Sequence, residues 1–163
     1  MYGLELNMEK TKIVYCKDDK RKGGHDNISF DFLGYTFRPR KVKTKHGTYF
    51  TGFLPAISEK AKKVISKEIR SWKLQLKSDK SLQDIANMFN STIQGWLNHY
   101  THFYKSETYE LLHYINTCLV KWARRKYKKL KARQKAVYWL GKVAKRQPKL
   151  FAHWKLGIVP SAG

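Results

Sequence analysis

The sequence has little cysteine and no long hydrophobic run. Its two cysteines, Cys16 and Cys118, lie far apart, with no second pair beside either. They therefore cannot build a disulfide framework or a four-ligand zinc site. No stretch approaches the roughly 20 apolar residues that span a bilayer, and no N-terminal run has the form of a secretion signal. These absences predict a cytoplasmic protein in a reducing environment, without a metal site or a membrane contact.

Acidic residues are scarce as well: 12 Asp and Glu stand against 34 Lys and Arg, a formal net charge of +22. Charge of one sign repels itself and favours a polyanionic partner, of which nucleic acid is the leading candidate. Disorder would also explain the charge, but the chain is 42% hydrophobic and 14% aromatic, which is more than disordered chains usually carry. The composition predicts a folded, basic protein that binds nucleic acid.

The sequence changes character near Pro55. Before it, short β-branched and aromatic runs alternate with turn residues, which predicts a small antiparallel sheet. Pro39 and Pro55 bound two of these runs, as expected for residues that cannot donate into a sheet ladder. The expected strands lie within residues 12–16, 28–37 and 48–54.

After Pro55, apolar residues recur at helical spacing. Ser58 is a candidate helix N-cap, Ser81 and Asp84 form a variant of the capping box, and Pro148 should follow the end of the last helix. The apolar faces of the four expected helices span residues 61–76, 82–103, 109–122 and 136–143. The expected fold is α+β but mainly α: a small antiparallel sheet, then a bundle of three long helices and a shorter one.

The strongest functional signal is the stretch 121–149, which contains thirteen Lys or Arg and no acidic residue. A solvated helix face would account for some of these cations. Such faces, however, usually carry both positive and negative side chains, which form ion pairs along the helix. A stretch that carries only positive charge suits the binding of phosphates. The predicted RNA-binding residues are Lys121, Arg124, Arg125, Tyr127, Lys128, Lys129, Lys131 and Arg133.

Aromatic residues lie between these cations, and aromatic rings can stack on unpaired bases. Trp122 and Trp139 fall on the apolar helix faces, so we expect them to pack in the core. Tyr127 lies off those faces and is the better candidate for stacking. The mixture of cations and one available ring suits structured RNA with exposed loops.

No catalytic residue is predicted. Tyr15 and the pair Asp18 and Asp19 resemble a polymerase metal motif, but there is one residue too many between Tyr15 and Asp18, and a polar turn is the better interpretation. His99, His102 and His113 could approach one another, yet no carboxylate or thiolate lies at ligand spacing. A glycine-rich phosphate loop and a nucleophile elbow are both missing. We therefore expect no cofactor.

Several blocks of the sequence, in order, resemble the C-terminal part of group II intron-encoded reverse transcriptases. Residues 3–12 (GLELNMEKTK) are similar to the segment after the catalytic hairpin of the palm, and residues 93–100 (IQGWLNHY) to the signature of the maturase-specific, or X, domain. Residues 151–154 (FAHW) are similar to the closing motif. The family often has a second Tyr where this chain has His99. A further block is similar to the primer grip: Phe32, Leu33, Gly34 and Tyr35.

The resemblance implies a palm remnant with a primer-grip-like block at residues 1–55 and a thumb fused with a maturase domain at residues 56–163. It implies binding of structured group II intron RNA, and of an RNA/DNA primer-template duplex, to assist splicing and retrohoming. The catalytic carboxylates of the family have no counterpart in this sequence. The chain should therefore be inactive alone as an RNA-directed DNA polymerase, and magnesium should matter only in a full-length polymerase.

Two alternatives remain open at this stage. The chain could supply the thumb to a separately encoded catalytic half, which would make it part of an enzyme. It could instead be an unrelated basic protein that binds nucleic acids without preference, in which case any duplex should bind equally well.

Overall fold

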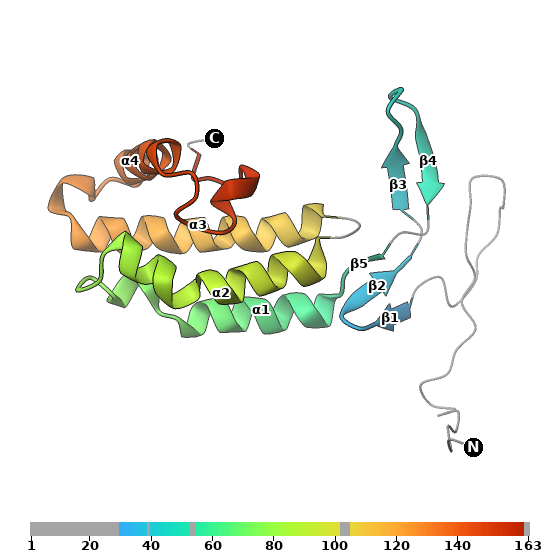
Figure 1. The fold of residues 1–163 in the computed structure, drawn as a ribbon, viewed down its shortest axis with the longest axis horizontal. Coiled ribbons are helices and arrows are strands. Elements are labelled where there is room, and N and C mark those ends of the chain that lie inside the picture. Colours follow the sequence, from blue (N-terminus) through green and yellow to red (C-terminus); the bar gives the residue numbers. More distant parts are fainter. Residues whose placement is uncertain (1–29, 39, 53–54, 102–104, 162–163) are drawn as a thin grey trace, which may run out of the picture.

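The computed structural model describes residues 30–38, 40–52, 55–101 and 105–161. Helices α1 (Glu59–Ser71), α2 (Leu82–Tyr100) and α3 (Ser106–Lys126) lie side by side, and α4 (Arg133–Arg146) lies over α3 (Figure 1). Short strands lie beyond one end of these helices. The mainly helical α+β fold is thereby confirmed.

The strands form two small antiparallel sheets where one was expected. Strands β1 (Phe30–Phe32), β2 (Tyr35–Phe37) and β5 (Pro55–Ile57) make one sheet in the order β1-β2-β5. Strands β3 (Arg40–Lys43) and β4 (Tyr49–Gly52) make a separate ribbon. The expected strand at residues 12–16 lies outside the described residues.

A tight turn divides the run at residues 28–37, which the sequence suggested as one strand. Phe32 pairs with Tyr35, which leaves a loop of only Leu33 and Gly34 between β1 and β2. Both loop residues have positive φ, 51° and 81°, as two-residue hairpin loops that match the strand twist require. The boundary that we placed after residue 55 stays a prediction, and β5 extends across it.

The expected helix starts are present, but the first helix ends early. Ser58 Oγ accepts from the Ala61 N–H, and Ser81 and Asp84 form a reciprocal capping box. Helix α1 ends at Ser71, so the expectation that it continues to Leu76 was wrong. Lys73 takes a left-handed conformation, φ 48°, which an α-helix cannot contain. A separate 3₁₀ turn, η1 (Leu74–Leu76), follows.

Aromatic residues hold the helices together. Trp72, at the end of α1, stacks on Phe89 and Trp96 of α2, with ring centroids 4.2 and 5.5 Å apart. Trp122 of α3 is fully buried, and its Nε1 donates to the Lys77 carbonyl at 2.8 Å. Since truncating a buried tryptophan costs about 3–5 kcal/mol, these rings carry much of the stability of the bundle.

Two asparagines bind the C-terminal segment, residues 150–161, to the bundle. Asn90 of α2 donates to the Leu150 carbonyl at 2.8 Å and accepts from the Ala152 N–H at 3.0 Å. Asn116 of α3 accepts from His153 Nε2 at 2.7 Å and Trp154 Nε1 at 2.9 Å. Its own amide donates to the Ile158 carbonyl at 3.1 Å. The segment is thus folded back onto α2 and α3 through buried and partly buried polar contacts.

His153 should make stability depend on pH. Burial, with His113 nearby, lowers the pKa of its imidazole from 6.5 to about 3. The folded state holds the ring neutral, whereas the unfolded chain protonates it below 6.5. Stability is therefore complete above pH 6.5 and falls as the pH drops toward 3.

We expect this histidine to remove about 2 kcal/mol from the free energy of unfolding between pH 7 and pH 5, as measured by urea titration. His153→Gln keeps a donor for Asn116 but does not titrate, so its stability should change less over the same range. An equal pH dependence in both proteins would contradict the assignment of a buried neutral ring.

Candidate nucleic-acid interface

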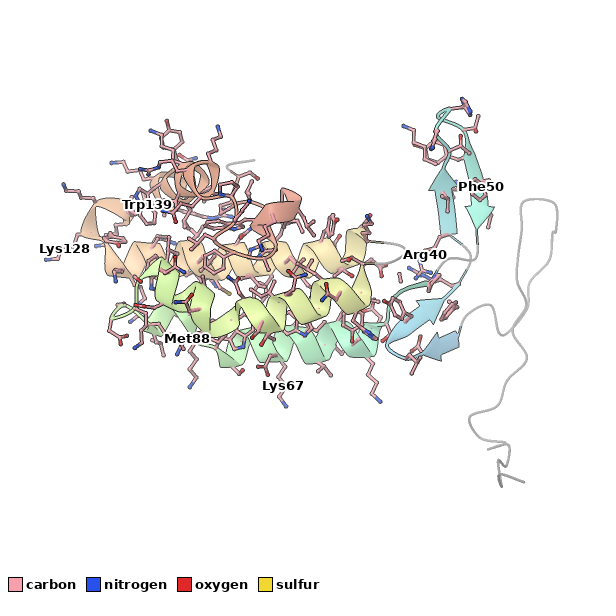
Figure 2. All side chains as sticks on the ribbon, in the orientation of Figure 1. Arg40, Phe50, Lys67, Met88, Lys128 and Trp139 are labelled. Carbon is pink, nitrogen blue, oxygen red and sulfur yellow. The ribbon has the colours of Figure 1, made fainter. Side chains whose placement is uncertain are left out.

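The end of α3 and the start of α4 form a surface of cations. Figure 2 shows this end, with Lys128, far from the strands. Lys128 and Lys129 lie on the 3₁₀ turn η2 (Lys128–Leu130), and Tyr127 caps α3. All eight residues predicted to bind RNA are exposed: Lys121, Arg124, Arg125, Tyr127, Lys128, Lys129, Lys131 and Arg133.

A hollow of about 590 Å³ opens among these cations. Its aromatic walls are Tyr127, which is 38% exposed, and the half-buried Trp139 of α4. Their ring centroids are 5.3 Å apart, and the Tyr127 ring stands nearly perpendicular to Trp122 at 6.0 Å. We call this the α3–α4 hollow; its lining is Lys126, Tyr127, Lys128, Lys129, Leu130 and Trp139.

The predicted packing roles of the two tryptophans have different outcomes. Trp122 is buried, as expected. Trp139 does pack against the core, but it also lines the α3–α4 hollow. Lys126, which the sequence did not single out, lies over the rings of Trp122 and Tyr127 and donates to the Lys80 carbonyl at 2.7 Å. The fold places Trp139 and Lys126 in the lining of the hollow, which the sequence alone did not indicate.

The cations at this end have no acidic residue in their own stretch of the chain, although Asp84 of α2 lies close enough to Lys126 to interact with it electrostatically. The sequence has no acidic residue after Glu110, and no described ion pair involves residues 121–149. Arg124 is partly engaged, because its Nε donates to the Lys131 carbonyl at 2.8 Å. Arg133 lies apart from the hollow, beside a small cavity that it shares with His113 and Asn116. The remaining cations are available to bind anions.

The primer-grip-like block lies at the opposite end of the bundle (Figure 1). Leu33 is 70% exposed, while Tyr35 is buried against the rings of His99 and Tyr100 at 5.5 and 5.8 Å. His99 Nε2 lies 3.2 Å from the Leu33 carbonyl. Phe32 belongs to β1. The primer-grip-like block thus contacts the end of α2, within the block at residues 93–100 that resembles the maturase signature. It does not lie at the α3–α4 hollow.

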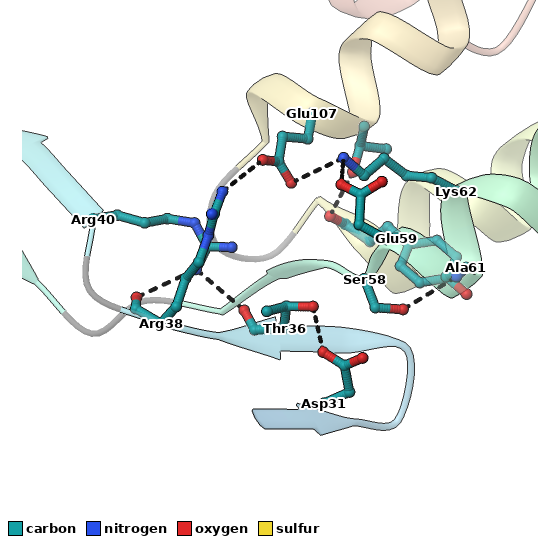
Figure 3. Close-up of polar contacts among 11 residues, drawn as sticks. Asp31, Thr36, Arg38, Arg40, Ser58, Glu59, Ala61, Lys62 and Glu107 are labelled. Atoms are coloured by element: carbon teal, nitrogen blue, oxygen red, sulfur yellow. Dashed lines mark hydrogen bonds and ion pairs between the residues drawn. The ribbon is translucent and has the colours of Figure 1, made fainter. Parts of the chain in front are cut away.

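Glu107, in the first turn of α3, links the strands to the helices (Figure 3). Its carboxylate lies 3.4 Å from Arg38 and 3.6 Å from Lys62. Lys62 also pairs with Glu59 at 2.5 Å, and this hydrogen bond lowers the pKa of the Glu59 carboxyl. Sequence reasoning missed Glu107, because its partners come from segments distant in the chain.

The described residues contain no group of three His, Cys, Asp or Glu that could hold a metal ion. His99 and His113 are described, whereas His102, like Tyr15, Asp18 and Asp19, lies outside the described residues. Burial raises the pKa of the Cys118 thiol, so this thiol is a poor nucleophile. Within the described part of the chain, no helix is long and apolar enough to cross a membrane.

The fold and this interface define a class of protein, a basic helical bundle that carries an aromatic hollow among its cations. Residues 62–139 match the family model of the group II intron, maturase-specific domain. This segment therefore belongs to that family, and it contains α2, α3 and every residue of the hollow. No curated protein and no solved structure matches the chain.

The contact between the primer-grip-like turn and α2 can be tested at Gly34. A Cβ at this position would lie 3.1 Å from the Tyr100 side chain, and φ is +81°. Gly34→Ala should therefore destabilise the protein by about 1–2 kcal/mol, lowering the melting temperature by about 2–8 °C.

Gly95→Ala is the matched control. Gly95 lies within α2, and a Cβ there would meet nothing within 4 Å, so alanine should stabilise by about 0.5–1 kcal/mol. Calorimetry of both variants checks the pair. A Gly34→Ala protein as stable as the parent would show that the turn does not dock on α2 as described.

Proposed function

We propose that this chain binds structured group II intron RNA as a maturase and thumb module that assists splicing and retrohoming. The observation that carries the proposal is the α3–α4 hollow, where two aromatic rings lie among lysines in a segment without acidic residues. The hollow falls within the maturase-specific match. Family and surface chemistry thus point to the same end of the bundle.

The chemistry divides between the two kinds of side chain. Exposed Arg125, Lys128 and Lys129 supply contacts to phosphates, which depend little on sequence. Tyr127 offers a partly exposed ring at the mouth of the hollow, and an unpaired base can stack there. Charge captures the RNA, and stacking favours RNA that has loops over a plain duplex.

The bundle holds these groups in place before RNA arrives. Trp122 is buried below Tyr127, and Trp139 approaches from α4. Lys126 lies over the Trp122 ring at 5.4 Å. A ring already positioned in this way loses little conformational entropy on binding, which favours affinity.

A second candidate function is that of a thumb for a separately encoded catalytic half. The exposed Leu33 at the primer-grip-like turn favours it, because this turn lies at the end away from the α3–α4 hollow. The catalytic half would supply the carboxylates and bind magnesium. Co-expression with a polymerase fragment that carries the Tyr-x-Asp-Asp hairpin should then restore primer extension, and extension by the present chain alone would contradict this division of labour.

A salt titration tests the charge contribution. If about six phosphates are neutralised, log affinity should fall against log salt with a slope near −4 to −5. Alanine at Arg125, Lys128 and Lys129 should make the slope shallower by about 2–3 units.

The matched control replaces three exposed lysines of α1 with alanine: Lys60, Lys63 and Lys67. The same net charge is lost, so a polycation that binds anywhere would respond equally to both triple variants. We expect the α1 variant to keep nearly the parent slope. Equal salt slopes for the two triple variants would show that the α3–α4 surface is not the RNA interface.

Tyr127→Ala tests the stacking contribution. It should weaken binding to a looped intron domain by about 1–3 kcal/mol and leave binding to a duplex of equal length and the salt slope unchanged. Tyr138→Ala is the control, since Tyr138 is 63% exposed on α4 but does not line the hollow. Equal affinity of the parent chain for both RNAs would leave only a nonspecific polycation.

A further inference from the structure

The ribbon of β3 and β4 stands away from the helices (Figure 1), with Phe50 on β4 (Figure 2). Tyr49 is 66% exposed and Phe50 is 45% exposed. A two-stranded ribbon alone is marginally stable in water, and large exposed rings are common where a protein meets a partner. This ribbon is thus a candidate second surface.

Local contacts define the shape of the ribbon. At its tip, the hydroxyls of Thr44 and Thr48 lie 2.7 Å apart, and the Thr44 N–H donates to the Thr48 carbonyl at 2.7 Å. Gly47 supplies the positive φ of 85° that the turn needs. At the base, Arg40 Nη1 donates to the Thr36 carbonyl of β2 at 3.1 Å. The ribbon is anchored at one end and closed at the other.

The register sorts its side chains onto two different faces. Lys43 pairs with Tyr49, Val42 with Phe50, and Lys41 with Thr51. Because alternate residues of a strand point to opposite faces, Lys41, Lys43 and Tyr49 share one face, while Val42 and Phe50 share the other. Lys43 Nζ lies 6.0 Å from the centre of the Tyr49 ring. One face is cationic with an aromatic ring, and the middle of the other face is apolar.

We propose that the lysine–tyrosine face of the ribbon (Lys41, Lys43 and Tyr49) binds an unpaired strand of RNA. The lysines contact phosphates, and Tyr49 stacks on a base. The inference goes beyond the proposed function, because this face lies at the opposite end of the molecule from the α3–α4 hollow. The chain then holds RNA at two separate places.

Charge complementarity favours this occupant. Between Asp31 and Glu59 the sequence contains five Lys or Arg and no acidic residue, so the partner is an anion. Lysines beside an exposed ring are the arrangement used for single strands, whose bases are free to stack. A duplex hides the faces of its bases, so it would use the lysines alone and gain nothing from Tyr49.

The experiment isolates the ribbon by using the full chain with Tyr127, Lys128 and Lys129 replaced by alanine, which disables the α3–α4 hollow. The probe is a fluorescent oligouridylate of about 12 nucleotides, followed by anisotropy. This background should still bind the oligonucleotide. Adding Tyr49→Ala should weaken that binding about fivefold or more, and Tyr49→Phe should restore it.

Phe50→Ala is the control for the ring, because it truncates an exposed aromatic residue on the other face of the same ribbon. It should leave the affinity unchanged. Lys41→Ala with Lys43→Ala should make the salt slope shallower by about 1.4 units, whereas Lys63→Ala with Lys67→Ala on α1 should not.

Three results would overturn the proposal. The first is that the variant with the disabled hollow no longer binds the oligonucleotide. The others are equal losses of affinity from Tyr49→Ala and Phe50→Ala, and equal salt slopes for the two double-lysine variants. Stronger competition by polyglutamate than by unlabelled oligouridylate would also overturn it, by assigning the face to an acidic protein segment. None of these results tests the proposed function of the α3–α4 hollow. That function would be contradicted if the variant with alanine at Tyr127, Lys128 and Lys129 bound the intron domain as tightly as the parent protein does.

Discussion

The carboxamide of Asn116 is the interaction on which the rest of the structure depends. Its oxygen accepts hydrogen bonds from His153 and Trp154, and its nitrogen donates to the Ile158 carbonyl, all in a buried site. A buried amide that loses its partners costs about 1–3 kcal/mol per unsatisfied group, so these bonds form together or fail together. They hold the C-terminal segment across α3, and the Pro160 carbonyl then lies so near Gly141 that a Cβ there would be 3.2 Å away. Helix α4 is held between α3 and this segment.

The position of α4 in turn makes the α3–α4 hollow. One side of the hollow comes from the end of α3 and η2, and the other is Trp139 of α4. Among the described residues, no acidic side chain forms an ion pair with the cations at the rim. The ribbon and the primer-grip-like turn lie at the other end, where Glu107 joins Arg38 to the bundle. The core of the molecule thus lies between basic surfaces at its two ends. This arrangement would suit a protein that binds one large folded RNA at several points.

Local patterns in the sequence predicted the parts of this fold that depend on neighbours in the chain. The helical faces, the Ser58 cap and the capping box of Ser81 and Asp84 follow from spacing over a few residues. The bonds of Asn116 to His153 and Trp154 join residues 37 and 38 positions apart, and a single polar residue on a helix gives no periodic signal. Trp139 falls on the apolar face of its helix, which predicts packing, whereas its place in the hollow depends on its contact with Tyr127 at the end of α3. The division of the run at residues 28–37 into two paired strands was missed because it depends on the left-handed turn at Leu33 and Gly34.

The central claim is that the placement of a few side chains, and not total charge, determines where RNA binds. Crosslinking of the full chain to a group II intron domain containing 4-thiouridine, with the crosslinked peptides identified by mass spectrometry, tests it most directly. The account predicts crosslinks concentrated at Tyr127 and its neighbours in η2, with a second group at Tyr49 of the ribbon. Excess unlabelled intron domain should remove them, and excess duplex should not. Crosslinks spread over the exposed faces of α1 and α2 in proportion to their lysines, and removed equally by either competitor, would contradict it.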